Sequence, residues 1–290
     1  TAGHSLLSLL YPPECTWCGQ ATAFHCRLCP ACRQLFVSNY YRCQRCATPL
    51  PSVVPNQDCF RCREAKWRFS RVLTLGPYRG ELRQAVILMK KPRFELLRRA
   101  LGELLAEQVL DSDTAPAAKI APGDAPAPQH PAASADGLSQ ANGPSTGQGR
   151  LPAARQARGE SPAGELAPWL VPVPNHWSHG FSSAANTAES LARAIARPTG
   201  WRVATRIVGR IRKTAKQGML SWTERKRNVR GAFAINRTQG LSGRHVMLVD
   251  DVLTSGATAA ELSRLLLKAG AARVSVLVIA RGTGARESPH

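Results

Sequence analysis

The stretch VMLVDDVLTSGAT, residues 246–258, predicts a strand, a tight loop and the start of a helix. Its first four residues are apolar and β-branched at both ends, which is typical of a buried parallel strand. Small and hydroxyl residues form the loop, and leucines at helical spacing then continue to a stop signal at Gly270. Units of this kind alternate in α/β folds, so the stretch indicates that fold class.

The loop has the composition of a phosphate site. Backbone N–H groups at the start of a helix converge on one spot, and the helix dipole favours negative charge there. Gly256 lets the backbone approach closely, and hydroxyl residues on both sides of it add donors. Asp250 and Asp251 can accept hydrogen bonds from ribose hydroxyls or help to hold Mg²⁺. A sugar phosphate with a vicinal diol fits both halves; the alternative is an ordinary strand end with a solvated acidic pair.

In this order the residues resemble the phosphoribosyl-pyrophosphate (PRPP) motif of type I phosphoribosyltransferases. The resemblance implies that Asp250 and Asp251 are the catalytic pair and that Mg²⁺ accompanies PRPP. The PRPP- and phosphate-binding set that it implies is Val249, Asp250, Asp251, Thr254, Ser255, Gly256, Ala257 and Thr258.

The chain is strongly basic. Its 290 residues carry a formal net charge of +20, from 39 basic and 19 acidic residues. Residues 61–99 hold twelve Lys or Arg against three Glu, and residues 206–230 hold nine against one. Such asymmetry points to polyanions, either phosphorylated metabolites or nucleic acid, although a solvated basic face is the alternative for each cluster.

The nine cysteines all lie between Cys15 and Cys62 and form two successive CxxC…CxxC units. Four thiolates suit tetrahedral Zn²⁺, so the pattern predicts two structural zinc ribbons. A disulfide framework is the alternative, but the rest of the chain lacks cysteine. Cys26 also forms a CxxC with Cys29, and we prefer the pairing that leaves Cys26 as a spare thiol. The predicted ligands are Cys15, Cys18, Cys29, Cys32, Cys43, Cys46, Cys59 and Cys62.

Further motifs extend the resemblance to the ComF (competence protein F) family. They are RVLTLGPYRGELRQAVILMKKPRF at 71–94, WLVPVPNH at 169–176 and KQGMLSWTERKRNVRGAF at 216–233. The family resemblance implies a double zinc ribbon followed by a phosphoribosyltransferase-like domain. It also implies a phosphoribosyl transfer to an unknown acceptor, linked to DNA uptake or nucleotide metabolism. The alternative function is a non-catalytic module that binds single-stranded DNA or a helicase partner.

We expect a mostly parallel α/β sheet with flanking helices. The expected strands are 71–76, 169–173, 204–208, 246–250 and 274–280, and the expected helices are 80–90, 94–110, 182–197 and 257–269. The expected domains are the ribbons at 1–66 and the transferase-like domain at 67–110 and 167–284. Residues 111–166 are rich in Ala, Pro, Gly and Ser, so we expect a disordered insertion there.

Pyrophosphate contacts are implied in the loop PNHWSHGF, residues 174–181, and in a covering segment within 209–230. The family usually carries arginines in the first loop, whereas this chain has His179. Histidine is mostly neutral at pH 7 and offers no guanidinium fork, so pyrophosphate handling should be weakened. The candidate contacts are Asn175, His176, Lys213, Lys216, Arg225 and Arg227.

Targeting signals are weak in the sequence. The apolar runs fall short of the ~20 residues that a membrane span needs. The opening stretch TAGHSLLSLLYPP lacks a basic region and a long apolar region, so it does not resemble a signal peptide. We therefore expect a cytoplasmic protein.

Overall fold

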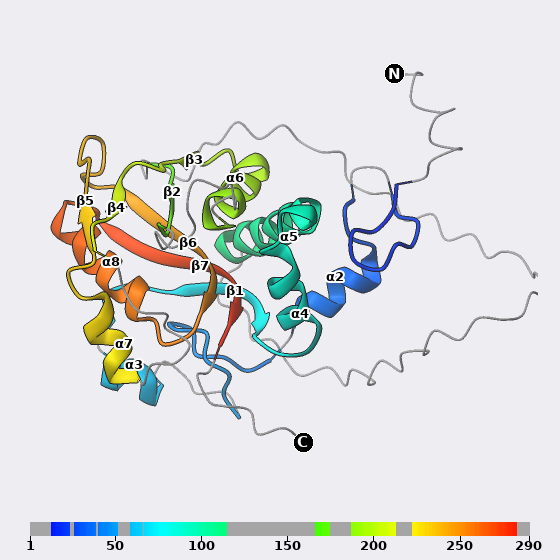
Figure 1. Cartoon of the computed structure of the whole chain (residues 1–290), viewed down its shortest axis with the longest axis horizontal. Helices are drawn as coiled ribbons and strands as arrows, with labels where there is room; N and C mark the ends of the chain where they lie inside the picture. Colours follow the sequence, from blue (N-terminus) through cyan, green and yellow to red (C-terminus); the bar gives the residue numbers. More distant parts are fainter. Residues whose placement is uncertain are drawn as a thin grey trace, which may run out of the picture.

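A parallel five-stranded sheet forms the centre of the molecule (Figure 1). This computed structural model describes residues 13–23, 26–38, 40–51, 59–65, 67–114, 166–174, 187–212 and 222–282. The strand order is β1-β7-β6-β2-β3, and every neighbouring pair is parallel. The strands are β1 (Val72–Pro77), β2 (Trp169–Pro172), β3 (Arg202–Val203), β6 (His245–Leu253) and β7 (Arg273–Arg281). The predicted fold class is confirmed.

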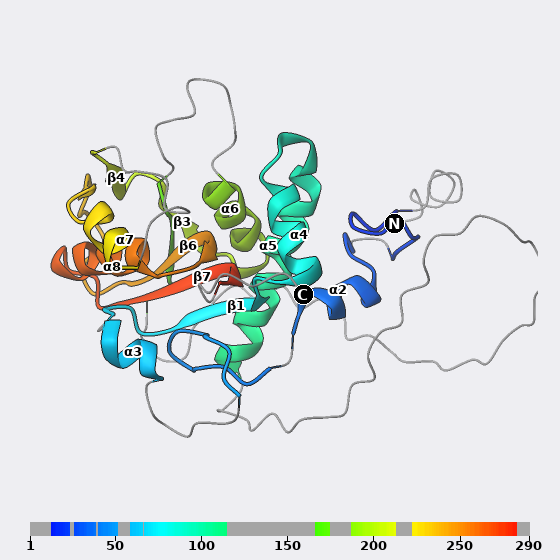
Figure 2. The ribbon, with the colours of Figure 1, turned by 60° about the horizontal axis from the view of Figure 1, so that its bottom comes forward.

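Helices cover both faces of the sheet. In Figure 2, α4, α5 and α6 lie on one side of the sheet and α3 lies on the other. A two-stranded antiparallel ribbon of β4 and β5 lies beside the main sheet. The helices are α2 (Pro30–Phe36), α3 (Phe60–Ala65), α4 (Gly80–Met89), α5 (Glu95–Thr114), α6 (Thr187–Thr199), α7 (Trp222–Val229) and α8 (Ala257–Lys268). The short 3₁₀ turn is η1 (Pro92–Phe94), and the ribbon strands are β4 (Val208–Arg210) and β5 (Phe233–Ile235).

Alternate side chains of the central strand β6 enter two separate cores. Val246 and Leu248 belong to the core that includes α8, whereas Met247 and Val249 belong to the core that includes α4, α5 and α6. All four side chains are fully buried. A strand buried on both faces reads as a continuous apolar run, which explains the unbroken VMLV of the sequence.

The two cysteine-rich units lie against different cores. Cys15, Cys29 and Cys32 pack with Leu residues of α4 and α5, together with Phe36 of α2. The second unit, with Cys43 and Cys62 among its members, packs in the other core with Trp67 and α8. The second cysteine unit is therefore on the side of the sheet that carries the helix after the acidic pair.

Several predicted elements are corrected. The expected strand 204–208 is wrong: β3 ends at Val203, Ala204 donates a last hydrogen bond to Leu170 O at 2.8 Å, and the chain turns. The apolar residues that follow belong instead to β4, which pairs antiparallel with β5. The sequence analysis did not predict β5 or α7. Helix α5 continues to Thr114, four residues into the expected insertion, and residues 115–165 lie outside the described residues.

Candidate functional site

The acidic pair lies within the last part of β6, at the carboxyl edge of the parallel sheet. Asp250 pairs in register with Val278 of β7, and β6 continues to Leu253. The neighbouring chain after β2 is held there by a hydrogen bond from Val173 N to Val249 O at 2.9 Å. Ligands of open α/β sheets bind at this edge, so the pair has the expected position.

Each carboxylate accepts a hydrogen bond from the backbone that follows it. Asp250 Oδ1 accepts from Asp251 N at 2.9 Å, and Asp251 Oδ1 accepts from Val252 N at 2.7 Å. Burial, and then the negative charge of Asp251, raise the pKa of Asp250 to about 8. A positive charge near the pair opposes this rise in the pKa of Asp250.

Lys90 supplies such a cation. Its Nζ lies 2.6 Å from Asp251 Oδ2, at the residue that caps the end of α4. Burial lowers the pKa of Lys90, but Asp251 and Asp250 outweigh that effect and leave it raised. The sequence analysis did not include Lys90 in the site, although it lies in the basic tip that follows the helix at 80–90. Lys90 and the acidic pair are far apart in the sequence, so the sequence did not indicate that they are in contact.

Arg98 fixes the turn that carries Lys90. Its guanidinium is 1% exposed and donates to Met89 O through Nε at 2.8 Å and to Lys91 O through Nη2 at 3.5 Å. These carbonyls flank Lys90 on both sides. A buried guanidinium that binds backbone carbonyls holds a turn rigidly, so the position of Lys90 is set by the core.

Arg210 on β4 is a second basic residue near the acidic pair. Its guanidinium lies 4.8 Å from the ring centroid of Phe233 and donates to Pro174 O at 3.5 Å. Burial lowers the pKa of Arg210, and the nearby Asp250 partly offsets this. The sequence analysis placed Arg210 in the expected covering segment but did not assign it a contact.

The predicted phosphate-binding loop, residues 254–256, connects β6 to α8 and is called the phosphate loop below. Gly256 is the N-cap of α8 and has φ 76°, a left-handed conformation that favours glycine. A Cβ at Gly256 would also lie 3.1 Å from Nε1 of Trp67. Ser255 is buried, and its Oγ accepts a hydrogen bond from Ala257 N at 3.3 Å. The hydroxyl of Ser255 therefore shapes the loop itself, whereas Thr254 and Thr258 are half-buried at its two ends.

Arg281 connects the phosphate loop to the second cysteine unit. Its side chain is completely buried. Nη1 donates to Leu253 O at 2.7 Å and also to Thr254 O, while Nε donates to Cys46 O at 2.8 Å. Nη2 donates to Thr48 Oγ1 at 3.1 Å. One guanidinium thus binds the start of the loop and the second cysteine unit together.

The other predicted pyrophosphate contacts are incompletely described. Asn175, His176, Lys213 and Lys216 lie outside the described residues. Arg225 lies on α7, where the structure does not describe its side chain, and Arg227 is exposed on the same helix. These six contacts stay predictions.

The eight predicted zinc ligands form two groups of four. Within each group the ligand atoms all lie within 4.8 Å of one another, and Cys26 lies in neither group. The Sγ–Sγ distance is 3.7 Å for Cys18–Cys29 and 3.5 Å for Cys46–Cys59. A tetrahedron with Zn–S bonds of about 2.3 Å has edges of about 3.8 Å, so both groups fit Zn²⁺. Zinc held there would connect separate segments of the chain and stabilise them structurally.

Comparison with known proteins agrees with both halves of this architecture. A family model described as a double zinc ribbon domain matches residues 6–63, and one described as a phosphoribosyl transferase domain matches residues 180–290. The resemblance to the ComF family is confirmed. The DNA utilization protein YhgH of Salmonella typhimurium is 27% identical over 278 residues, which cover 94% of this chain and 99% of that protein. The protein of the same name from Escherichia coli K12 matches to the same extent.

A second kind of relative has a name from natural competence. The Competence protein F of Haemophilus influenzae is 33% identical over 117 residues, which cover 39% of this chain and 49% of that protein. One kind of relative is thus named for DNA utilization and the other for competence. Within the part of the chain that the structure describes, no helix has the length and apolarity needed to cross a membrane.

Proposed function

We propose that the carboxyl edge of the sheet binds PRPP or a related ribose 5-phosphate ligand. The observation that carries this proposal is the order of groups along a single strand–loop–helix unit. The carboxylates of Asp250 and Asp251 lie on β6, and only the loop with Gly256 separates that strand from the N-terminus of α8. A ribose ring with a 5-phosphate places its diol and its phosphate at opposite ends, as this unit does.

The phosphate would bind at the start of α8. The N–H groups of the first helical turn lack partners within a helix, and the helix dipole favours a dianion there. Thr254 and Thr258 each carry a hydroxyl at an end of the loop and would add neutral donors. The fixed left-handed Gly256 and the inward hydroxyl of Ser255 keep the loop preorganised, so little ordering entropy is lost on binding.

The acidic pair would bind the ribose hydroxyls, and the ammonium of Lys90 holds the carboxylate of Asp251 in place through their ion pair. If the chain is a transferase, the bond between the anomeric carbon and pyrophosphate breaks as a nitrogen acceptor attacks. Positive charge then develops on the ribose, and the carboxylates at the strand end would stabilise it. Lys90 and Arg210 are the described cations next to the pair that could face the leaving pyrophosphate. Mg²⁺ would bind PRPP and the carboxylates jointly, as the resemblance implies.

Calorimetry on the zinc-loaded protein tests the binding proposal. Ribose 5-phosphate and PRPP should both bind, whereas ribose alone and inorganic phosphate alone should each bind at least tenfold more weakly. This result is expected because the two halves of the site act on two halves of one ligand. Absence of binding by both sugar phosphates at millimolar concentration would overturn the proposal. Release of pyrophosphate from PRPP with a nitrogen acceptor would then separate a transferase from a binding module.

A second function, binding of single-stranded DNA, is favoured by the distribution of charge. The chain keeps a large positive net charge after allowance for the zinc sites, because eight thiolates and two Zn²⁺ contribute only about −4. A ligand such as ribose 5-phosphate needs only a few positive charges, whereas a polyanion binds many. The names of the relatives refer to DNA utilization and competence, which supports the same candidate. A helicase partner stays a prediction from the family resemblance.

A further inference from the structure

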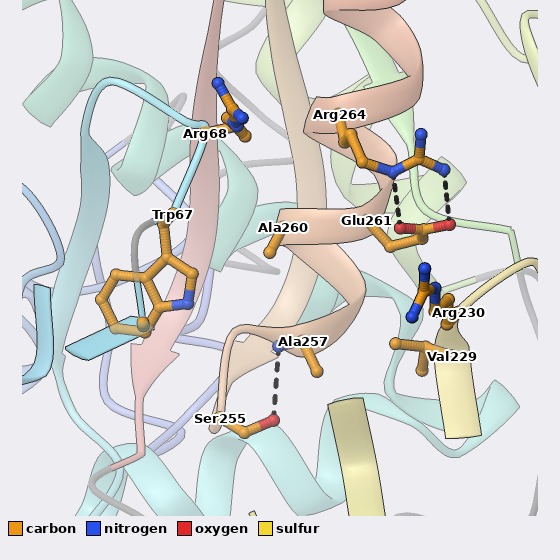
Figure 3. Close-up of a pocket in the computed structure, with 10 residues that line it drawn as sticks. Trp67, Arg68, Val229, Arg230, Ser255, Ala257, Ala260, Glu261 and Arg264 are labelled. Carbon is orange, nitrogen blue, oxygen red and sulfur yellow. Dashed lines mark hydrogen bonds and ion pairs between the residues drawn. The ribbon is translucent and has the colours of Figure 1, made fainter. Parts of the chain in front are cut away.

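A groove runs along the outer side of α8, with a cavity volume of about 440 Å³. Ala257 and Ala260 form its floor, on the helix face opposite to Leu262 and Leu266, which enter the core. Figure 3 shows Trp67 on one side of this floor and Val229, the last residue of α7, on the other. The groove therefore has an apolar floor and walls, built from three segments that are distant in sequence.

The rims of the groove are basic. Arg68 lies beside Trp67, Arg230 follows Val229, and Arg264 lies one helical turn beyond Ala260 (Figure 3). Among the lining residues that the structure describes, Glu261 is the only acidic one. It forms an ion pair with Arg264 at 2.9 Å and accepts a hydrogen bond from Gly231 N at 3.1 Å. The charges of Glu261 and Arg264 cancel each other. Arg68 and Arg230 are both exposed, so the rims keep two positive charges.

This groove lies beside the proposed phosphoribosyl site, and among its described lining residues it shares only Ser255 and Ala257 with that site. Asp250, Asp251 and Lys90 are absent from its lining. Ser255 and Ala257 line the groove next to the phosphate loop, and the hydroxyl of Ser255 already accepts a hydrogen bond from Ala257 N. A ligand in the groove would lie along the side of α8, whereas the sugar phosphate would lie at the end of that helix.

The groove is also where the two basic clusters of the sequence meet. Arg68 belongs to the cluster at 61–99, and Arg230 is the last residue of the cluster at 206–230. Both border the same groove, which also includes Ala65 at the end of α3. The basic residues Arg61 and Arg63 lie on α3, and exposed Arg227 lies on α7, so basic side chains continue from the groove along both helices.

We propose that the groove binds a segment of single-stranded nucleic acid. The phosphates would face Arg68 and Arg230, and a sugar or base would lie over the alanine floor between Trp67 and Val229. A cavity of about 440 Å³ falls within the size range of pockets that hold small ligands, which suits one nucleotide unit of a longer strand. Single-strand sites combine a positive groove with apolar or aromatic contacts to bases, and this groove has both. The proposal rests on the second proposed function and assigns a place to it.

Nucleic acid fits better than an acidic peptide because the charge extends beyond the groove. A strand carries one phosphate per nucleotide, so it can contact the basic residues on α3, at the rims and on α7 in succession. A short peptide would place its carboxylates in the groove, next to the carboxylate of Glu261. Affinity for an acidic peptide is therefore the competing outcome of the test.

The test uses the full zinc-loaded chain and a fluorescently labelled oligothymidylate of about 20 nucleotides, titrated by anisotropy at several salt concentrations. The variant Arg68→Gln with Arg230→Gln should lose at least tenfold in affinity at low salt. Its slope of log affinity against log salt should fall by about 1.4, which is about 0.7 for each phosphate contact to a single strand. The control Arg193→Gln with Arg237→Gln makes the same charge change at exposed positions outside the groove and should change affinity less than threefold.

A second variant, Ala260→Glu, places a negative charge on the floor without removing an arginine and should also weaken binding at least tenfold. Melting temperature and zinc content show whether each variant is folded.

Equal losses of affinity in the groove and control variants would overturn the assignment of single-strand binding to this groove, while single-strand binding by the chain would still stand. Absence of binding by the wild-type chain would overturn both. A poly-glutamate peptide that binds the wild type as tightly as the oligonucleotide would also overturn it. Binding of ribose 5-phosphate should be unchanged in the Arg68→Gln with Arg230→Gln variant, which separates this outcome from a failure of the phosphate site.

Discussion

The guanidinium of Arg281 donates a hydrogen bond to the backbone carbonyl of Cys46 at 2.8 Å, although the two residues are 235 positions apart. The same guanidinium binds Leu253 O, where the phosphate loop begins. Cys46 is one of the four predicted ligands of the second zinc site. The position of a zinc knuckle and the position of the loop are thus set by one buried side chain.

We expect loss of the second zinc to weaken binding at the phosphate loop. Cys46→Ser should remove one zinc equivalent and reduce the affinity for ribose 5-phosphate at least fivefold, because the carbonyl partner of Arg281 loses its fixed position. Arg281→Lys should have a similar effect with zinc retained, since an ammonium cannot reproduce the fork of donors. Zinc analysis and calorimetry measure the two quantities separately.

The matched control lies in the first zinc site. Cys18→Ser should also remove one zinc equivalent, but that site packs with α4 and α5 in the core that does not include α8. Its affinity for ribose 5-phosphate should stay within twofold of the wild type. Equal effects of the two cysteine variants would show that zinc acts on the whole fold and not through Arg281.

Lys90 should reduce the requirement of the acidic pair for Mg²⁺. In Lys90→Gln, Asp251 loses the ammonium at 2.6 Å, so PRPP should bind at least tenfold more weakly without Mg²⁺ and should gain more from added Mg²⁺ than in the wild type. Lys91→Gln is the control, because Lys91 is exposed at the next position and its replacement makes the same charge change. Identical magnesium dependence in both variants would contradict this role.

Asp250 should make the protein less stable as pH rises. Its pKa is about 8 in the folded protein against an ordinary value of 3.8, so between these values the folded protein holds a proton that the unfolded chain has lost. The unfolding free energy contributed by Asp250 therefore falls as pH increases from about 4 to about 8. Lys90, Asp251 and Arg210 are the charged groups that act on this carboxyl.

Asp250→Asn cannot titrate, so its advantage in unfolding free energy over the wild type should widen steadily from pH 5 to pH 8 and then level off. Denaturant unfolding at matched pH values measures this difference, and any loss of zinc at low pH affects both proteins alike. A constant difference over this range would show that Asp250 is ionised throughout.

Features that depend on residues close together in the sequence were predicted correctly. The strand, loop and helix around Asp250 follow from the spacing of the apolar residues and from the residue types in the loop. The predicted zinc ligands follow from the CxxC spacing. The expected strand at 204–208 failed because β3 ends at Val203 and the next apolar residues pair with β5, a partner chosen by tertiary packing.

Contacts between distant residues were beyond the sequence. Lys90 reaches Asp251 from the end of α4, and Arg281 reaches Cys46 from the end of β7. In the sequence each of these two residues is a basic residue that follows an apolar run, and its neighbours do not indicate a contact with a distant residue. Only the strand order, which places β1 beside β7 and β7 beside β6, brings these ends to one edge of the sheet.

The most direct test of the account is calorimetric titration of ribose 5-phosphate and PRPP into the wild type and two double variants. Thr254→Ala with Thr258→Ala should weaken both ligands more than tenfold, since each lost hydrogen bond to a charged group is worth about 1.5–3 kcal/mol. Asp250→Asn with Asp251→Asn should weaken PRPP most when Mg²⁺ is present, and both variants should keep their zinc and fold cooperatively. Wild-type binding that neither double variant changes would contradict the assignment of the phosphate and the ribose to this loop and this acidic pair.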